Sequence, residues 1–149
     1  MILRWLVAAV HLLALGIGLG AVVARAAALG DAREQAALRR AFRADTLWGV
    51  AAALWISTGL WRLFGGLDKE LAFYVNNHAF WTKLGLLVLV LLLEIVPMVT
   101  LIRWRMQDSR GDPVDTTRAS VLARISLLQA VLVVAMVLAA TAMARGIGI

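Results

Sequence analysis

The residues of this chain that could carry chemistry are few, and they interrupt its longest apolar runs. His11, Lys83, Glu94 and Gln129 each stand among aliphatic side chains. A charged or hydrogen-bonding group in such surroundings is costly, so each is a candidate for a functional role. The chain has no cysteine, which removes disulfides, thiolate zinc sites and thiol nucleophiles from consideration.

His11 is open to a structural and a chemical interpretation. As a structural group it would hydrogen-bond to a hydroxyl or carbonyl on a neighbouring helix. As a chemical group it would carry a proton or ligate a metal, because neutral imidazole is the commonest metal ligand and titrates near physiological pH. One histidine is too few ligands for a bare metal ion, whereas a haem iron needs only one or two axial ligands. Arg4, Gly18 and Arg25 lie at seven-residue intervals along the same helical face as His11.

Lys83 and Glu94 lie eleven residues apart, or three helical turns, and therefore share one face of a helix. At ~1.5 Å per residue about 16 Å of helix separates them, so they cannot pair with each other. Lys83 would extend its ammonium group to the membrane surface. The candidate partners of Glu94 are Arg43, Arg124 and Gln129, and the alternative is a protonated carboxyl group.

Composition indicates that a lipid bilayer surrounds these residues. Of the 149 residues, 62% are apolar and 16% are charged, against roughly half and a quarter in soluble domains. A soluble fold of this size leaves about 30% of its unfolded-chain surface exposed and cannot hide this excess. Four stretches are long and apolar enough to cross a membrane, namely residues 5–24, 46–61, 80–102 and 125–144. We predict an all-α integral membrane protein with one domain over residues 1–149, an up-down-up-down four-helix bundle.

Orientation is predicted from the basic residues between the spans. Ten arginines fall in the first and third connections, whereas five basic residues fall in the second connection and at the two termini. The positive-inside rule then places both termini of this multi-pass protein outside, on the side away from the cytoplasm. The basic loops are expected to contact anionic lipid rather than nucleic acid. Residues 67–77 of the second connection mix charged and aromatic side chains, which favours a short interfacial helix.

On such a bundle several of the polar residues meet near the outer surface. Basic side chains at that rim would neutralise the propionates of a haem b whose iron His11 ligates, and apolar side chains would surround its ring. The same cations and imidazole would equally suit the headgroup of a quinone. The expected set consists of His11, Arg4, Arg62, Lys83, Trp55, Met136 and Gly18.

Residues 72–83, with the sequence AFYVNNHAFWTK, precede a leucine-rich helix that contains Pro97 and ends near Arg103-Trp104-Arg105. This pattern resembles a family of small bacterial predicted membrane proteins that carry a domain of unknown function. A more distant likeness is to HemJ-type protoporphyrinogen oxidases and CopD-like membrane domains. HemJ-type proteins bind haem b and have a histidine in the first helix and a lysine opening the third, which His11 and Lys83 match. Arg62 would match a basic residue after the second helix, and the likeness implies haem binding without implying the oxidase activity.

Three functional hypotheses remain open at this point. The first is a haem b-binding redox protein of the bacterial inner membrane, with His11 as axial ligand. The second is a non-catalytic membrane scaffold or complex subunit, since the sequence contains no complete catalytic set. The third is proton-linked transport along the side of the bundle between His11 and Glu94, or quinone binding. Four helices are few for a transporter, so the transport hypothesis requires a homo-oligomer.

Overall fold

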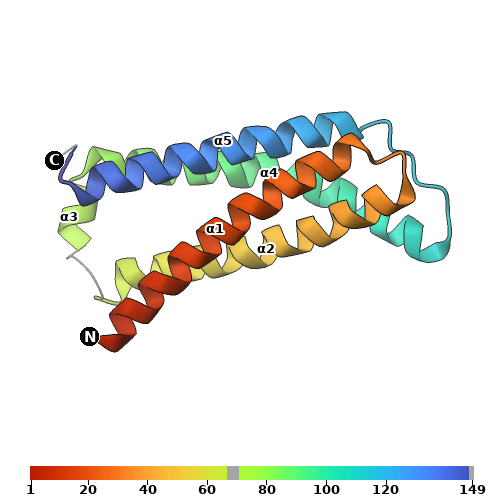
Figure 1. The fold of residues 1–149 in the computed structure, drawn as a ribbon. Helices are drawn as coiled ribbons and strands as arrows, with labels where there is room; N and C mark the ends of the chain where they lie inside the picture. The colour runs from red at the N-terminus through yellow and green to blue at the C-terminus, as the bar shows by residue number, and fades with distance from the viewer. Residues whose placement is uncertain (67–70, 148–149) are drawn as a thin grey trace.

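Four long helices and one short helix make up the computed structural model, which describes residues 1–66 and 71–147 (Figure 1). No strand occurs in these ranges. The prediction of an all-α four-helix bundle is confirmed, and each predicted span lies within one long helix. The helices are α1 (Ile2–Gly30), α2 (Gln35–Phe64), α3 (Leu71–Val75), α4 (His78–Arg110) and α5 (Ala119–Ala144).

Local sequence signals define both ends of α4. At its start the Asn77 side chain accepts a hydrogen bond from the backbone N–H of Ala79 at 2.8 Å, as an N-cap residue does. At its end Gly111 adopts a φ of 74°, in the left-handed region that a glycine occupies without steric cost. The N–H of Asp112 then bonds to the carbonyl of Gln107 at 3.0 Å, which closes a Schellman motif.

The bundle consists of two helix pairs joined along one side. α1 packs against α2, α4 packs against α5, and α1 also packs against α5. The start of α1 and the end of α5 lie at the same end of the molecule, which we call the terminal end (Figure 1). α2 and α4 approach each other at the opposite end and diverge toward the terminal end (Figure 1). α2 and α4 therefore pack against each other less than the three pairs named above.

The outward faces of the long helices are apolar. All four are long and apolar enough to cross a membrane, with mean hydropathy between 1.3 and 2.7 over their most apolar windows. Leucines such as Leu12, Leu92 and Leu138 are about three-fifths exposed, which in water would be an extensive apolar surface. In a bilayer these side chains contact lipid, so the helices span the membrane.

The short helix α3 lies in the second connection, where the sequence predicts one. Its Tyr74 ring contacts Phe80 of α4, with 5.7 Å between ring centroids. Asp68, Lys69 and Glu70, which belong to the same predicted segment, lie outside the described residues.

Candidate functional site

His11 lies buried between α1 and α2 in the half of the bundle near the terminal end. Its Nδ1 is 2.9 Å from Oγ1 of Thr58. The Thr58 hydroxyl also lies 2.7 Å from the carbonyl oxygen of Leu54, which can only accept. The hydroxyl has one proton, so both contacts are hydrogen bonds at once only when Nδ1 of His11 donates. The imidazole stacks on Trp55 with 5.4 Å between ring centroids. Its Cε1 also lies 3.2 Å from where a Cβ on Gly59 would be, so that glycine makes room for the ring.

Of the three basic residues expected near His11, the structure brings Lys83 close to the aromatic ring that His11 contacts. Lys83 of α4 places its Nζ 5.4 Å from the ring centroid of Trp55, a cation–π distance. Lys83 and His11 therefore contact the same indole. Arg62 is half-buried near the end of α2, and Arg4 is exposed and donates to the carbonyl of Gly66 at 3.4 Å.

The most extensive polar site lies in the other half of the bundle, around Arg25. This side chain is fully buried. Its guanidinium donates to both carboxylate oxygens of Glu94, at 2.7 and 2.9 Å, in the bidentate geometry that suits arginine. It also donates to Asp45 at 2.8 Å, to Gln129 at 2.8 Å and to Ser126 at 3.0 Å. One arginine thus ties together all four long helices.

A second arginine balances the charge of this site. Arg105 of α4 donates to the other carboxylate oxygen of Asp45 at 2.7 Å and to the carbonyl of Phe42 at 2.7 Å. With its members ionised, the group Arg25, Asp45, Glu94 and Arg105 has no net charge. We call these four residues the ion cluster. Balanced pairing of this kind is what allows charges to remain inside a membrane protein.

The ion cluster corrects two sequence predictions. Arg25 is not a loop residue, because α1 continues to Gly30 and buries it within the bundle. The ion-pair partner of Glu94 is Arg25, and not Arg43 or Arg124, because Arg25 reaches Glu94 from the facing helix. The predicted hydrogen bond from Gln129 to Glu94 is present at 2.8 Å, and the same amide donates to the carbonyl of Val90.

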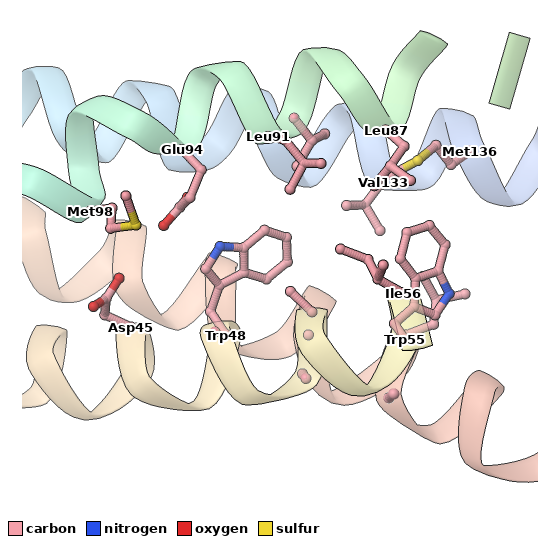
Figure 2. A pocket seen from close by; sticks show the side chains of 17 residues that line it. Asp45, Trp48, Trp55, Ile56, Leu87, Leu91, Glu94, Met98, Val133 and Met136 are labelled. Carbon is pink, nitrogen blue, oxygen red and sulfur yellow. The ribbon is translucent and has the colours of Figure 1, made fainter. Parts of the chain in front are cut away.

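A cavity of about 180 Å³ lies between α2 and α4 and extends from the ion cluster toward Trp55 (Figure 2). Asp45 and Glu94 line one end, and Trp55 and Met136 lie toward the other. Between them the walls are mostly apolar, with Trp48 projecting into the middle. The two carboxylate side chains keep 15% and 19% of their surface accessible. The cavity therefore combines apolar walls with an acidic end.

His11 and Lys83 are not among the described residues that line this cavity. Both stand against Trp55, which belongs to its wall. Within residues 1–66 and 71–147, no group of three or more His, Asp or Glu side chains could hold a metal ion. Ligation of a haem iron by His11 stays a prediction.

Sequence reasoning missed several residues of the site, though some signals were available. Arg25 lies on the same helical face as His11 and Gly18, at the same seven-residue interval. If that face points into the bundle, Arg25 points into the bundle too. Glu94 needed a cation at its own depth, which an arginine on the first span supplies. Nothing in the sequence singles out Asp45, Trp48, Arg105 or Ser126, because their roles depend on how the helices pair.

Comparison with known proteins assigns the chain to a family. Residues 3–148 match the family model described as "Predicted membrane protein (DUF2214)". The chain belongs to this family. No curated protein and no solved structure matches the chain. The resemblance to an uncharacterised membrane protein family is confirmed, whereas the likeness to HemJ-type and CopD-like proteins is not shown by these matches.

Proposed function

We propose that this protein binds a lipophilic small molecule in the cavity between α2 and α4. The observation that carries the proposal is the cavity itself, an apolar space inside the membrane with two accessible carboxylates at one end. Ligand sites are typically apolar with a few polar groups that fix orientation. Leu91 and Met98 line the cavity and are also nearly half exposed on the outside of the bundle, so an apolar molecule dissolved in the bilayer would reach this space sideways, between α2 and α4.

The volume of the cavity limits the size of the enclosed part of the ligand. Its 180 Å³ compares with an engineered apolar cavity of about 150 Å³ that binds benzene. Sites for drug-sized molecules are larger, at about 300–1,000 Å³. The space therefore suits a single substituted ring, and an attached alkyl tail would extend into lipid between α2 and α4. A haem macrocycle is too large for it.

The test uses a ring probe, 1-bromo-4-decylbenzene, whose bromine quenches tryptophan fluorescence. Trp48 and Trp55 line the cavity, so a bound probe quenches them. In lipid nanodiscs we expect saturable quenching of the wild type. Ala52→Phe fills the cavity, since Ala52 lines it, and should weaken probe binding at least tenfold.

The matched control is Ala53→Phe, which adds the same ring at an exposed position on the same helix. This variant should bind the probe like the wild type. Quenching that does not saturate, or that is equal in Ala52→Phe and the wild type, would refute the proposed site. Such a result would mean that the probe quenches only from the surrounding lipid.

Haem b binding through His11 is a second candidate, outside the cavity. The observation in its favour is the 2.9 Å contact between Nδ1 and the Thr58 hydroxyl, in which Nδ1 is placed to donate. Haem-ligating histidines commonly donate their other ring N–H in this way. An absorption spectrum after expression with added haem tests it. A Soret band that is lost in His11→Ala would support the candidate, and no band in the wild type would exclude it.

We also propose a bacterial inner-membrane location with both termini outside. With Arg25 inside the bundle, nine basic residues remain on the predicted cytoplasmic side against five on the other, so the bias persists. Arg39, Arg40 and Arg43 line an exposed hollow on α2, which supports contact with anionic lipid. A homo-oligomer, a scaffold role and proton-linked transport stay predictions. Fusion of a periplasm-active reporter to each terminus measures the orientation.

A further inference from the structure

We infer that the head of the bound molecule is an uncharged aromatic ring that carries hydroxyl groups, as in a hydroquinone or a phenol, held at the acidic end of the cavity. This inference rests on the proposed function, and it names the ligand class for that same site. Three properties of the acidic end support it: spare acceptor positions, a donor in the wall, and the absence of net charge.

The carboxylates of the ion cluster still have room for further donors. A carboxylate accepts about four hydrogen bonds. Among the described residues Glu94 receives three, two from Arg25 and one from Gln129. Asp45 receives two, from Arg25 and Arg105. Both side chains line the cavity and neither is fully buried, so a ring hydroxyl that enters would find an acceptor.

A donor stands beside these acceptors. Trp48 is 7% exposed, and Figure 2 shows its indole nitrogen on the side of the ring that faces the Glu94 end of the cavity. An indole N–H can only donate, and a buried one usually finds a partner. The described hydrogen bonds do not include one from this group. A ring oxygen in the cavity would satisfy the Trp48 N–H while its own proton goes to a carboxylate.

Charge decides between a hydroxyl head and a cationic head. A lone pair of carboxylates would select a lipophilic cation, but Arg25 and Arg105 already balance Asp45 and Glu94. An added ammonium group would leave the site with a net positive charge inside the membrane, which is costly. An uncharged hydroxyl adds no charge and still gains a hydrogen bond to an ionised acceptor, the stronger kind.

The test compares three probes that share a decyl tail, each as a competitor of 1-bromo-4-decylbenzene in nanodiscs. They are 2-decyl-1,4-hydroquinone under anaerobic reducing conditions, its dimethyl ether, which has no hydroxyl donor, and decyltrimethylammonium. We expect the hydroquinone to bind about tenfold to a hundredfold more tightly than the ether, the range for a hydrogen bond to a charged group. The ammonium probe should bind more weakly than either.

Two variants report on the donor. Trp48→Phe keeps a ring in the wall and removes the N–H, so it should weaken hydroquinone binding at least threefold. Trp5→Phe, at an exposed position near the terminal end, should leave that affinity unchanged. Equal weakening in both variants, or no weakening in Trp48→Phe, would overturn the role of Trp48.

The outcomes separate the inference from the proposed function. If the hydroquinone and the ether bind within twofold of each other and Ala52→Phe weakens both, the cavity binds rings but the hydroxyl assignment is wrong. If the ammonium probe binds most tightly, the head is a cation and the inference is overturned. If none of the three competitors displaces 1-bromo-4-decylbenzene and Ala52→Phe has no effect on its binding, the proposed function fails as well.

Discussion

Removal of the Arg25 guanidinium is predicted to destabilise the fold more than the loss of any other single charge in the ion cluster. Arg25 makes five hydrogen bonds that reach α2, α4 and α5. In Arg25→Gln the carboxylates of Asp45 and Glu94 remain, and only Arg105 is left to balance them. The result is an unpaired negative charge inside the bundle. A glutamine at this position is also too short to reach all four partner residues.

The magnitude follows from the cost of breaking a buried ion pair. Removal of one partner typically costs about 3–5 kcal/mol, because the other charge stays buried. For a chain of about this size, 1 kcal/mol corresponds to roughly 2–4 °C in the midpoint of thermal unfolding. We therefore expect Arg25→Gln to lower that midpoint by about 6–20 °C. Circular dichroism in detergent micelles at one fixed scan rate measures it.

Two further variants make this prediction specific. Arg33→Gln removes an arginine that is exposed in the first connection and should shift the midpoint by no more than about 2 °C. Arg25→Gln combined with Glu94→Gln leaves Asp45 and Arg105 as a balanced pair, so the double variant should be more stable than Arg25→Gln alone. The reasoning is refuted if Arg25→Gln and Arg33→Gln unfold at the same temperature. It is also refuted if the destabilisation of the double variant equals the sum of the destabilisations by Arg25→Gln and Glu94→Gln alone.

Two other predictions concern local contacts. Gly59→Ala places a Cβ 3.2 Å from Cε1 of His11 and should lower the midpoint of thermal unfolding. In Gly85→Ala the new Cβ meets no atom within 4 Å, and the midpoint should rise because alanine favours a helix over glycine by about 1 kcal/mol. Thermal unfolding of the two variants checks both signs, and a rise in both would contradict the packing of His11 on Gly59. Outside the membrane, hydrogen bonds from the Thr117 hydroxyl and backbone N–H hold the pKa of Asp115 below its ordinary value. The small stabilisation of the fold by this exposed carboxylate is therefore present above the unfolded-state pKa of Asp115, and it is lost as pH falls through the folded-state pKa. Thr117→Val should raise the pKa of Asp115 toward its ordinary value in an NMR titration, and an unchanged pKa would exclude the hydroxyl as its main cause.

The sequence predicts the fold of this protein well because a bilayer imposes a simple length rule. Each span needs about 20 apolar residues, and such runs are visible without knowledge of their neighbours. Helix ends are less visible, since α1 and α2 continue past the predicted spans with residues that are merely good helix formers. The first apolar run ends at residue 24, which predicts that Arg25 belongs to the first connection. α1 instead continues to Gly30 and places Arg25 inside the bundle.

The site was only partly predictable because it depends on which helices pair. Glu94 and Gln129 were recognised as costly groups that need partners, and they do contact each other. His11 was also recognised, but its contacts with Thr58 and Trp55 place it beside the cavity and not in it. Asp45 lies at the edge of a predicted span and gave no signal of burial. Its role appears only when Arg25 and Arg105 reach it from two other helices.

The central claim, that the cavity between α2 and α4 binds a lipophilic ring, is tested most directly by photolabelling. The probe is a decyl-substituted phenyl diazirine, activated by light in nanodiscs, with the labelled positions mapped by peptide mass spectrometry. We predict label on buried cavity-lining residues such as Val90 and Val133, and its loss when 2-decyl-1,4-hydroquinone is in excess. Label confined to lipid-facing positions such as Leu92, undiminished by the competitor, would contradict the account.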